Sequence, residues 1–136
     1  MTSTQEIQGA PRMPAREAEG HKGTFGTVTI IGGNAAGLGR SGLRQAVRLA
    51  GQRVMIGAPA LAANAALRGG AGLAVMLLPA PILASALTIA PSATGVALPT
   101  SARGEILGSD AASLLDELLP STHCLAIGPG LGGIED

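Results

Sequence analysis

The run TVTIIGGN occupies residues 27–34 and combines β-branched residues with a glycine turn. β-branched residues favour strands and Gly-Gly-Asn favours a turn, so this run predicts a strand over Thr27–Ile31. Three further runs have the length and apolar character of strands: Leu73–Leu78, Thr94–Leu98 and Cys124–Ile127. A continuous apolar run such as the first of these is typical of a strand covered on both faces.

Helices are expected between these strands. Four segments have helical composition or spacing: Leu43–Ala50, Pro59–Leu67, Ile82–Ala90 and Asp110–Leu119. Ser109 or Asp110 is the expected N-cap of the last helix, because short polar side chains satisfy free N–H groups of a first turn. Strands that alternate with helices form a parallel sheet with helices on its faces. The sequence therefore predicts an α/β fold with a mostly parallel sheet.

Composition excludes several classes of protein. The 136 residues are 46% hydrophobic and carry no net charge, which is typical of a globular domain and argues against nucleic acid as the main partner. Phe25 is the only aromatic residue, so bases cannot stack on a platform of rings. The uncharged stretch from Gly69 to Ala102 could span a bilayer by length, but Pro79 and Pro81 interrupt it. We therefore expect a buried strand and helix there, and no membrane partner.

Cys124 is the only cysteine. It cannot form an internal disulfide, which favours a reducing cytoplasm. Because it lies in an apolar run, we expect a core residue rather than a nucleophile. No spacing of His, Cys, Asp or Glu predicts a metal site.

The charges are unevenly distributed. No Asp or Glu occurs between Glu19 and Glu105. The basic residues in that span are Lys22, Arg40, Arg44, Arg48, Arg53, Arg68 and Arg103. A segment of one sign suits an anionic ligand such as a nucleotide, and the alternative is a solvated basic face.

Two glycine-rich segments follow predicted strands, Gly32-Gly33-Asn34 and Gly128–Gly133. Ligands of open α/β sheets bind beyond the carboxyl ends of the strands, where glycine lets backbone N–H groups approach phosphates. A nucleotide-like ligand and two tight turns without a ligand are both compatible with this pattern. The spacing G-x-G-x-x-G also occurs at Gly37 and at Gly128, but a Rossmann site is disfavoured. The first strand ends near Ile31, too far before Gly37, and no acidic residue follows within about 20 positions.

Several blocks together resemble the family of NAD(P)H-hydrate dehydratases. Five blocks carry the resemblance: residues 13–28, 30–34, 55–63, 66–73 and 126–132. The first contains His21-Lys22-Gly23-Thr24-Phe25-Gly26, the third begins Met55-Ile56-Gly57-Ala58, and the last reads Ala126-Ile127-Gly128-Pro129-Gly130-Leu131-Gly132. They cover most of residues 13–133, and their order and spacing are more specific than any one block.

The resemblance implies a partial ribokinase-like fold with three layers and a lyase activity. Family members dehydrate the hydrated forms of NADH and NADPH, called NADHX and NADPHX, with ADP or ATP and Mg²⁺. The resemblance also implies that Ala58 and Gly130 line the hydrate pocket and that Gly128 shapes the loop that contains Gly130. His21 and Lys22 are further candidates for the same pocket. A cytoplasmic homo-oligomer is expected for the full-length protein.

The chain departs from the family pattern in two ways. Residues 35–54 form an atypical insert, whose expected helix has Leu43, Val47 and Ala50 on one stripe and Arg40, Arg44 and Arg48 on another. The later family motifs are missing, so we expect the catalytic residues beyond the C-terminus and no activity from this chain alone. The expected organisation is a leader or linker over residues 1–20 and the N-terminal part of a dehydratase domain over residues 21–136. The alternatives are a small-molecule kinase of the ribokinase superfold and a non-enzymatic fragment that acts as an interaction module.

Overall fold

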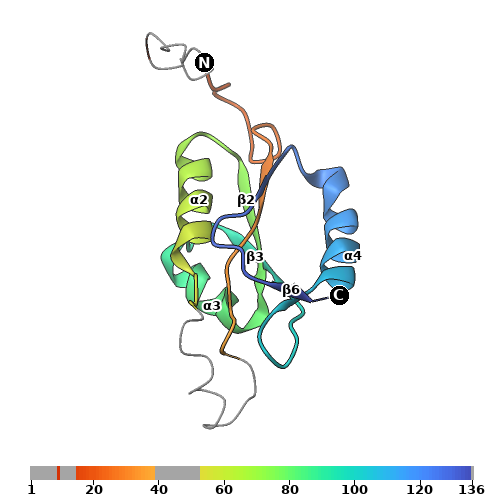
Figure 1. Cartoon of the computed structure of the whole chain (residues 1–136). Helices are drawn as coiled ribbons and strands as arrows, with labels where there is room; N and C mark the ends of the chain where they lie inside the picture. Colours follow the sequence, from red (N-terminus) through yellow and green to blue (C-terminus); the bar gives the residue numbers. More distant parts are fainter. Residues whose placement is uncertain (1–8, 10–14, 39–52, 136) are drawn as a thin grey trace, which may run out of the picture.

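A four-stranded parallel sheet with the strand order β3-β2-β1-β5 is the centre of the molecule (Figure 1). The computed structural model describes Gly9 and residues 15–38 and 53–135. The strands of this sheet are β1 (Thr27–Ile31), β2 (Leu73–Pro79), β3 (Thr94–Leu98) and β5 (Cys124–Ile127). The helices are α2 (Gly57–Arg68), α3 (Ala80–Ile89), α4 (Gly108–Leu118) and the 3-10 helix η1 (Leu119–Ser121).

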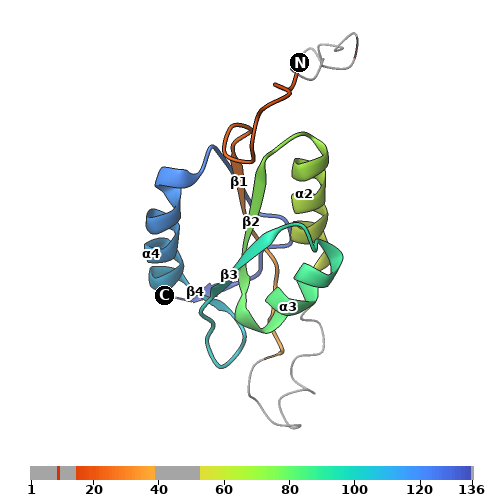
Figure 2. The same cartoon turned by 180° about the vertical axis from the view of Figure 1, so that it is seen from behind.

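The helices form a layer on each face of the sheet. Helices α2 and α3 cover one face, and α4 lies on the other (Figures 1 and 2). Side chains alternate between the faces of a strand, so Ile30 of β1 packs in the core under α2 whereas Ile31 packs on the α4 side. Ala60 and Ala63 are fully buried on α2, and their small side chains let this helix approach the sheet closely. The α/β prediction and its mostly parallel sheet are confirmed.

A second, very short sheet was not predicted from the sequence. It pairs β4 (Ile106–Leu107) with β6 (Ile134–Glu135) in parallel. Two-residue strands have no periodicity to detect, and their pairing joins positions far apart in the chain.

The expected N-cap of α4 was wrong. The helix begins at Gly108, Leu107 occupies the N-cap position, and no side chain of the described residues caps it. Strand β4 continues directly into α4, and the Leu107 N–H donates to the carbonyl of Pro99 at 3.0 Å. This strand pairing sets the start of the helix in place of a polar cap.

The prediction that Cys124 is a core residue was also wrong, because its side chain is exposed. Cys124 begins β5, the outermost strand on one side of the sheet. The helix expected over Leu43–Ala50 lies outside the described residues. Within the described residues, no helix has both the length and the apolar character needed to cross a membrane.

Candidate binding site at the carboxyl ends of the strands

The two glycine-rich segments meet at one edge of the sheet. Strands β1 and β5 are parallel neighbours, so the turns that follow them lie side by side. The Gly128 N–H donates to the Ile31 carbonyl at 3.0 Å, and the Gly33 N–H donates to the Pro129 carbonyl at 2.9 Å. We call Gly32, Gly33, Gly128 and Gly130 the glycine cradle.

All four positions of the cradle disfavour a side chain. Gly128 has φ +122°, and a Cβ atom at Gly32 would overlap the Pro129 carbonyl oxygen. Gly33 has φ +77° and Gly130 has φ +66°, a region that other residues rarely adopt. A Cβ atom at Gly33 would lie 2.7 Å from Cδ1 of Ile82. At Gly130 it would lie 3.0 Å from Cβ of Met55 and 3.4 Å from Cβ of Ala58. The backbone of the cradle therefore has no side chains over it at these positions.

The N-terminus of α2 forms the third side of the cradle. Ala58 is in the first turn of α2 and lies against Gly130. No side chain of the described residues caps this helix, and its first turn holds no acidic residue. The first N–H groups of a helix have no intrahelical acceptor and carry the positive end of the helix dipole. An anion is the ligand that this arrangement favours.

Asn34 and Met55 pair with each other on either side of residues 35–54. Each donates its backbone N–H to the carbonyl of the other, at 3.0 and 2.9 Å. The Asn34 Oδ1 accepts a hydrogen bond from Ala36 N at 2.8 Å, and the side chain of Asn34 lies against Gly132. Asn34 and Met55 therefore form part of the rim of the cradle.

A small charged cluster lies next to this rim. Arg103 pairs with Glu105 at 3.3 Å and with Glu135 at 3.3 Å, and its carbonyl accepts the Gly37 N–H at 3.1 Å. Hydrogen bonds from Ser101 first and from Arg103 second hold the pKa of Glu135 below its ordinary value. The Arg103 side chain is 57% exposed, so its charge faces solvent beside the cradle.

The cradle can bind a ligand but offers no acid or base. Residues 32–34, 55–58 and 128–130 contain no titratable side chain. The described residues also contain no group of three His, Cys, Asp or Glu side chains that could hold a metal ion.

The five expected site residues divide between the two ends of the sheet. Ala58, Gly128 and Gly130 come together at the carboxyl ends of the strands. His21 and Lys22 lie at the amino ends, because the Lys22 backbone packs against Gly72, immediately before β2 begins. The structure therefore does not bring the latter two residues to the cradle.

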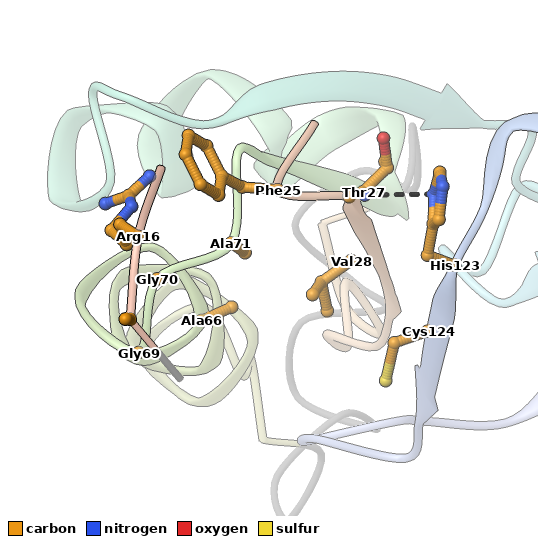
Figure 3. Close-up of a pocket in the computed structure, with 12 residues that line it drawn as sticks. Arg16, Phe25, Thr27, Val28, Ala66, Gly69, Gly70, Ala71, His123 and Cys124 are labelled. Atoms are coloured by element: carbon orange, nitrogen blue, oxygen red, sulfur yellow. Dashed lines mark hydrogen bonds between the residues drawn. The ribbon is translucent and has the colours of Figure 1, made fainter. Parts of the chain in front are cut away.

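A separate pocket of about 490 Å³ also lies at the amino ends (Figure 3). Its lining comes from the segment before β1, from β1, from the end of α2 and from the start of β5. It includes Arg16, Phe25, Val28, Ala66, His123 and Cys124. Arg16 lies 4.0 Å from the centre of the Phe25 ring, and the Thr27 N–H donates to Nδ1 of His123 at 3.2 Å. These segments are far apart in the sequence, and no local motif predicted the pocket.

Comparison with known proteins identifies the class of fold. The structure is similar to that of a ribokinase-like superfamily protein of Enterococcus faecalis, with a TM-score of 0.58 and 22% sequence identity. The alignment covers 88% of this chain and 32% of the Enterococcus faecalis chain. The architecture is thus a ribokinase-like α/β fold.

A sequence relative adds to this likeness. The chain is 34% identical over 120 residues to the bifunctional NAD(P)H-hydrate repair enzyme of Moorella thermoacetica. The match covers 88% of this chain but 19% of that enzyme, so the chain spans about a fifth of the length of this curated relative. No family model matches the chain.

Proposed function

We propose that this chain is part of an ADP- or ATP-dependent NAD(P)H-hydrate dehydratase, a lyase of nicotinamide nucleotide repair. The observation that carries the proposal is the convergence of two glycine turns and an uncapped helix N-terminus at the carboxyl ends of β1 and β5. The likeness to a repair enzyme over 88% of the chain supports the substrate class.

The cradle fits the diphosphate of a hydrated dinucleotide. The backbone of Gly130 and the first turn of α2 surround a surface without carboxylates. Such groups bind phosphate oxygens without a counter-charge from a side chain. Ala58 and Gly130 then present a shallow apolar surface to the rest of NADHX or NADPHX.

In the proposed division of labour, this part of the chain binds and orients the hydrate. A bound nucleotide with Mg²⁺ would supply the phosphoryl group that converts the hydroxyl of the hydrate into a phosphate, which would then leave as inorganic phosphate in the elimination. The base that completes the elimination has no candidate in the cradle, since residues 32–34, 55–58 and 128–130 carry no titratable group. A cytoplasmic homo-oligomer as the working form is also part of this proposal.

The activity of the isolated chain tests this division. The chain is incubated with NADHX, Mg²⁺ and either ADP or ATP, and the recovery of NADH absorbance is followed. We expect no recovery above a control without protein, because general acid–base catalysis contributes about 10²–10⁴-fold and its residues are missing from the cradle. Recovery that depends on protein and nucleotide would contradict this proposed division of labour.

A further inference from the structure

The pocket at the amino ends of the strands has the size and the lining of a small-molecule site (Figure 3). Its volume of about 490 Å³ lies in the range in which proteins bind small molecules. Half of its twelve lining residues are glycine or alanine: Ala15, Gly26, Ala66, Gly69, Gly70 and Ala71. These short residues leave an open and largely apolar volume between the segment before β1, the end of α2 and the start of β5.

Two turns keep the backbone around this volume free of side chains. Gly26 has φ +74° and Gly70 has φ +104°, in the left-handed region that favours glycine. A Cβ atom at Gly26 would lie 3.3 Å from Cγ of His123. A side chain at Gly26 would therefore press on the His123 ring, which forms one wall of the pocket.

The charge at the pocket is positive. The guanidinium carbon of Arg16 lies 4.0 Å from the centre of the Phe25 ring. Stacking on the ring occupies one face of the guanidinium and leaves the N–H donors at its edge free. The described lining contains no Asp or Glu. Among residues 15–38 and 53–135, both ion pairs are made by Arg103, and neither involves Arg16. Arg16 is therefore available to a carboxylate.

The polar groups beside the apolar walls also suit an acid. The Ala66 carbonyl at the end of α2 already accepts the Ala71 N–H at 3.0 Å. Nδ1 of His123 accepts the Thr27 N–H at 3.2 Å. The proton of the neutral His123 ring is therefore on Nε2, which is a hydrogen-bond donor. A ligand with oxygen acceptors matches these groups.

We propose that this pocket binds a small organic acid, with a carboxylate on an aliphatic body. The carboxylate contacts Arg16, and the body lies along Val28 towards Cys124. Val28 and Cys124 are paired in register across β1 and β5, so their side chains lie on the same face of the sheet. In Figure 3, Arg16 and Phe25 lie on the α2 side of the pocket and Cys124 on the β5 side, with Val28 between them. The pocket and the glycine cradle are at opposite ends of the sheet, so this inference does not depend on the proposed function.

The single cysteine reports on the occupancy of the pocket, because its thiol is exposed and belongs to the lining. The rate at which Cys124 reacts with N-ethylmaleimide is measured in the 136-residue chain, with hexanoate as the probe. At about ten times the dissociation constant, only about a tenth of the sites stay open, so we expect a reaction about tenfold slower.

Hexanamide is the matched neutral compound. It has the same body without the charge, and it should bind at least about tenfold more weakly, because the charge-assisted contact with Arg16 is lost. An effect of an apolar additive on association of the chain would appear with both compounds. The difference between them therefore measures recognition of the carboxylate.

Variants locate the binding. Arg16→Gln should weaken the affinity for hexanoate about tenfold. Arg68→Gln, at an exposed arginine of α2 outside this lining, should leave the affinity unchanged. Ala66→Leu should abolish the protection by filling the pocket without a change of charge. If Ala66→Leu does not fold, the exposed Arg16 position decides.

Four results would overturn the proposal. They are a thiol rate that hexanoate leaves unchanged, equal protection by hexanoate and hexanamide, protection that survives Arg16→Gln, and protection by inorganic phosphate as strong as that by hexanoate. NADHX is absent from the measurement, so failure of the hydrate to bind at the glycine cradle would not affect this result.

Discussion

Gly130 has no side chain, and the atoms around it leave little room for one. Its φ of +66° lies in the left-handed region, and its neighbours are the side chains of Met55 and Ala58. Gly57 is a useful contrast because it belongs to the same site, begins α2 and has no heavy atom within 4 Å of an added Cβ. These two glycines separate the effect of conformation from the effect of adding a methyl group.

We predict that Gly130→Ala destabilises the fold by about 1–2 kcal/mol, the usual cost of a left-handed conformation for a residue with a Cβ atom. Gly57→Ala should be neutral or stabilising by up to about 1 kcal/mol, because alanine is the better helix former. Urea unfolding of both variants measures the difference. Equal effects of the two substitutions would contradict the conformational account of Gly130.

Glu135 gives a prediction about pH. Its pKa is held below the ordinary value by Ser101 and Arg103, so the ionised carboxylate is favoured in the folded state. Its contribution to stability is therefore present above the ordinary pKa and is lost as the pH falls through the lowered one. Glu135→Gln should make the unfolding free energy less dependent on pH in the acidic range. The contribution is small since Glu135 is partly exposed, and identical pH profiles for Glu135→Gln and the unaltered chain would count against it.

Among the elements, α2 depends on small residues for its place on the sheet. Ala60 and Ala63 are fully buried against the core that contains Ile30 and Met76. A larger side chain there has no space unless the helix moves away. Because α2 also presents Ala58 to the cradle, such a movement would disturb the proposed site.

We predict that Ala63→Leu costs about 1–3 kcal/mol through overpacking. Leu61→Ala, on the exposed side of the same helix, should change stability by no more than about 0.5 kcal/mol. Thermal or urea unfolding distinguishes the two variants. A tolerated Ala63→Leu would show that the α2 layer is less closely packed than the structure indicates.

The sequence predicted the main elements because their signals are local. The run Thr27–Ile31 became β1 with the expected bounds, and Cys124–Ile127 became β5. The start of α4 was mispredicted because β4 sets it through a bond to Pro99, a contact that composition does not encode. The pairing of Ile106 with Ile134 was missed for the same reason.

Burial was harder to predict than element type. The apolar run that contains Cys124 favours a covered strand, but coverage depends on which other elements are present. The glycine segments were informative because parallel neighbours β1 and β5 end at the same edge. His21 and Lys22 showed no such signal, since their place at the amino ends follows from packing of Lys22 on Gly72.

At the scale of the whole molecule, the side chains of Leu125 and Ile127 on β5, exposed in the described part of the chain, should make the isolated chain associate. Edge strands without charge pair readily, and exposed apolar patches favour aggregation. We predict polydisperse association of the purified chain by light scattering, reduced by Leu125→Asp. A sharp monomer with a cooperative melt would indicate that the described body is self-sufficient.

The central claim is that the glycine cradle binds the hydrated dinucleotide. Hydrogen exchange followed by mass spectrometry tests it directly and tolerates association of the chain. With saturating NADHX, we predict slower exchange in the segments that hold Gly33, Ala58 and Gly130, no change around Phe25 and Cys124, and loss of the effect in Gly130→Val. Unchanged exchange at the cradle, or protection confined to the pocket at the amino ends, would contradict the claim.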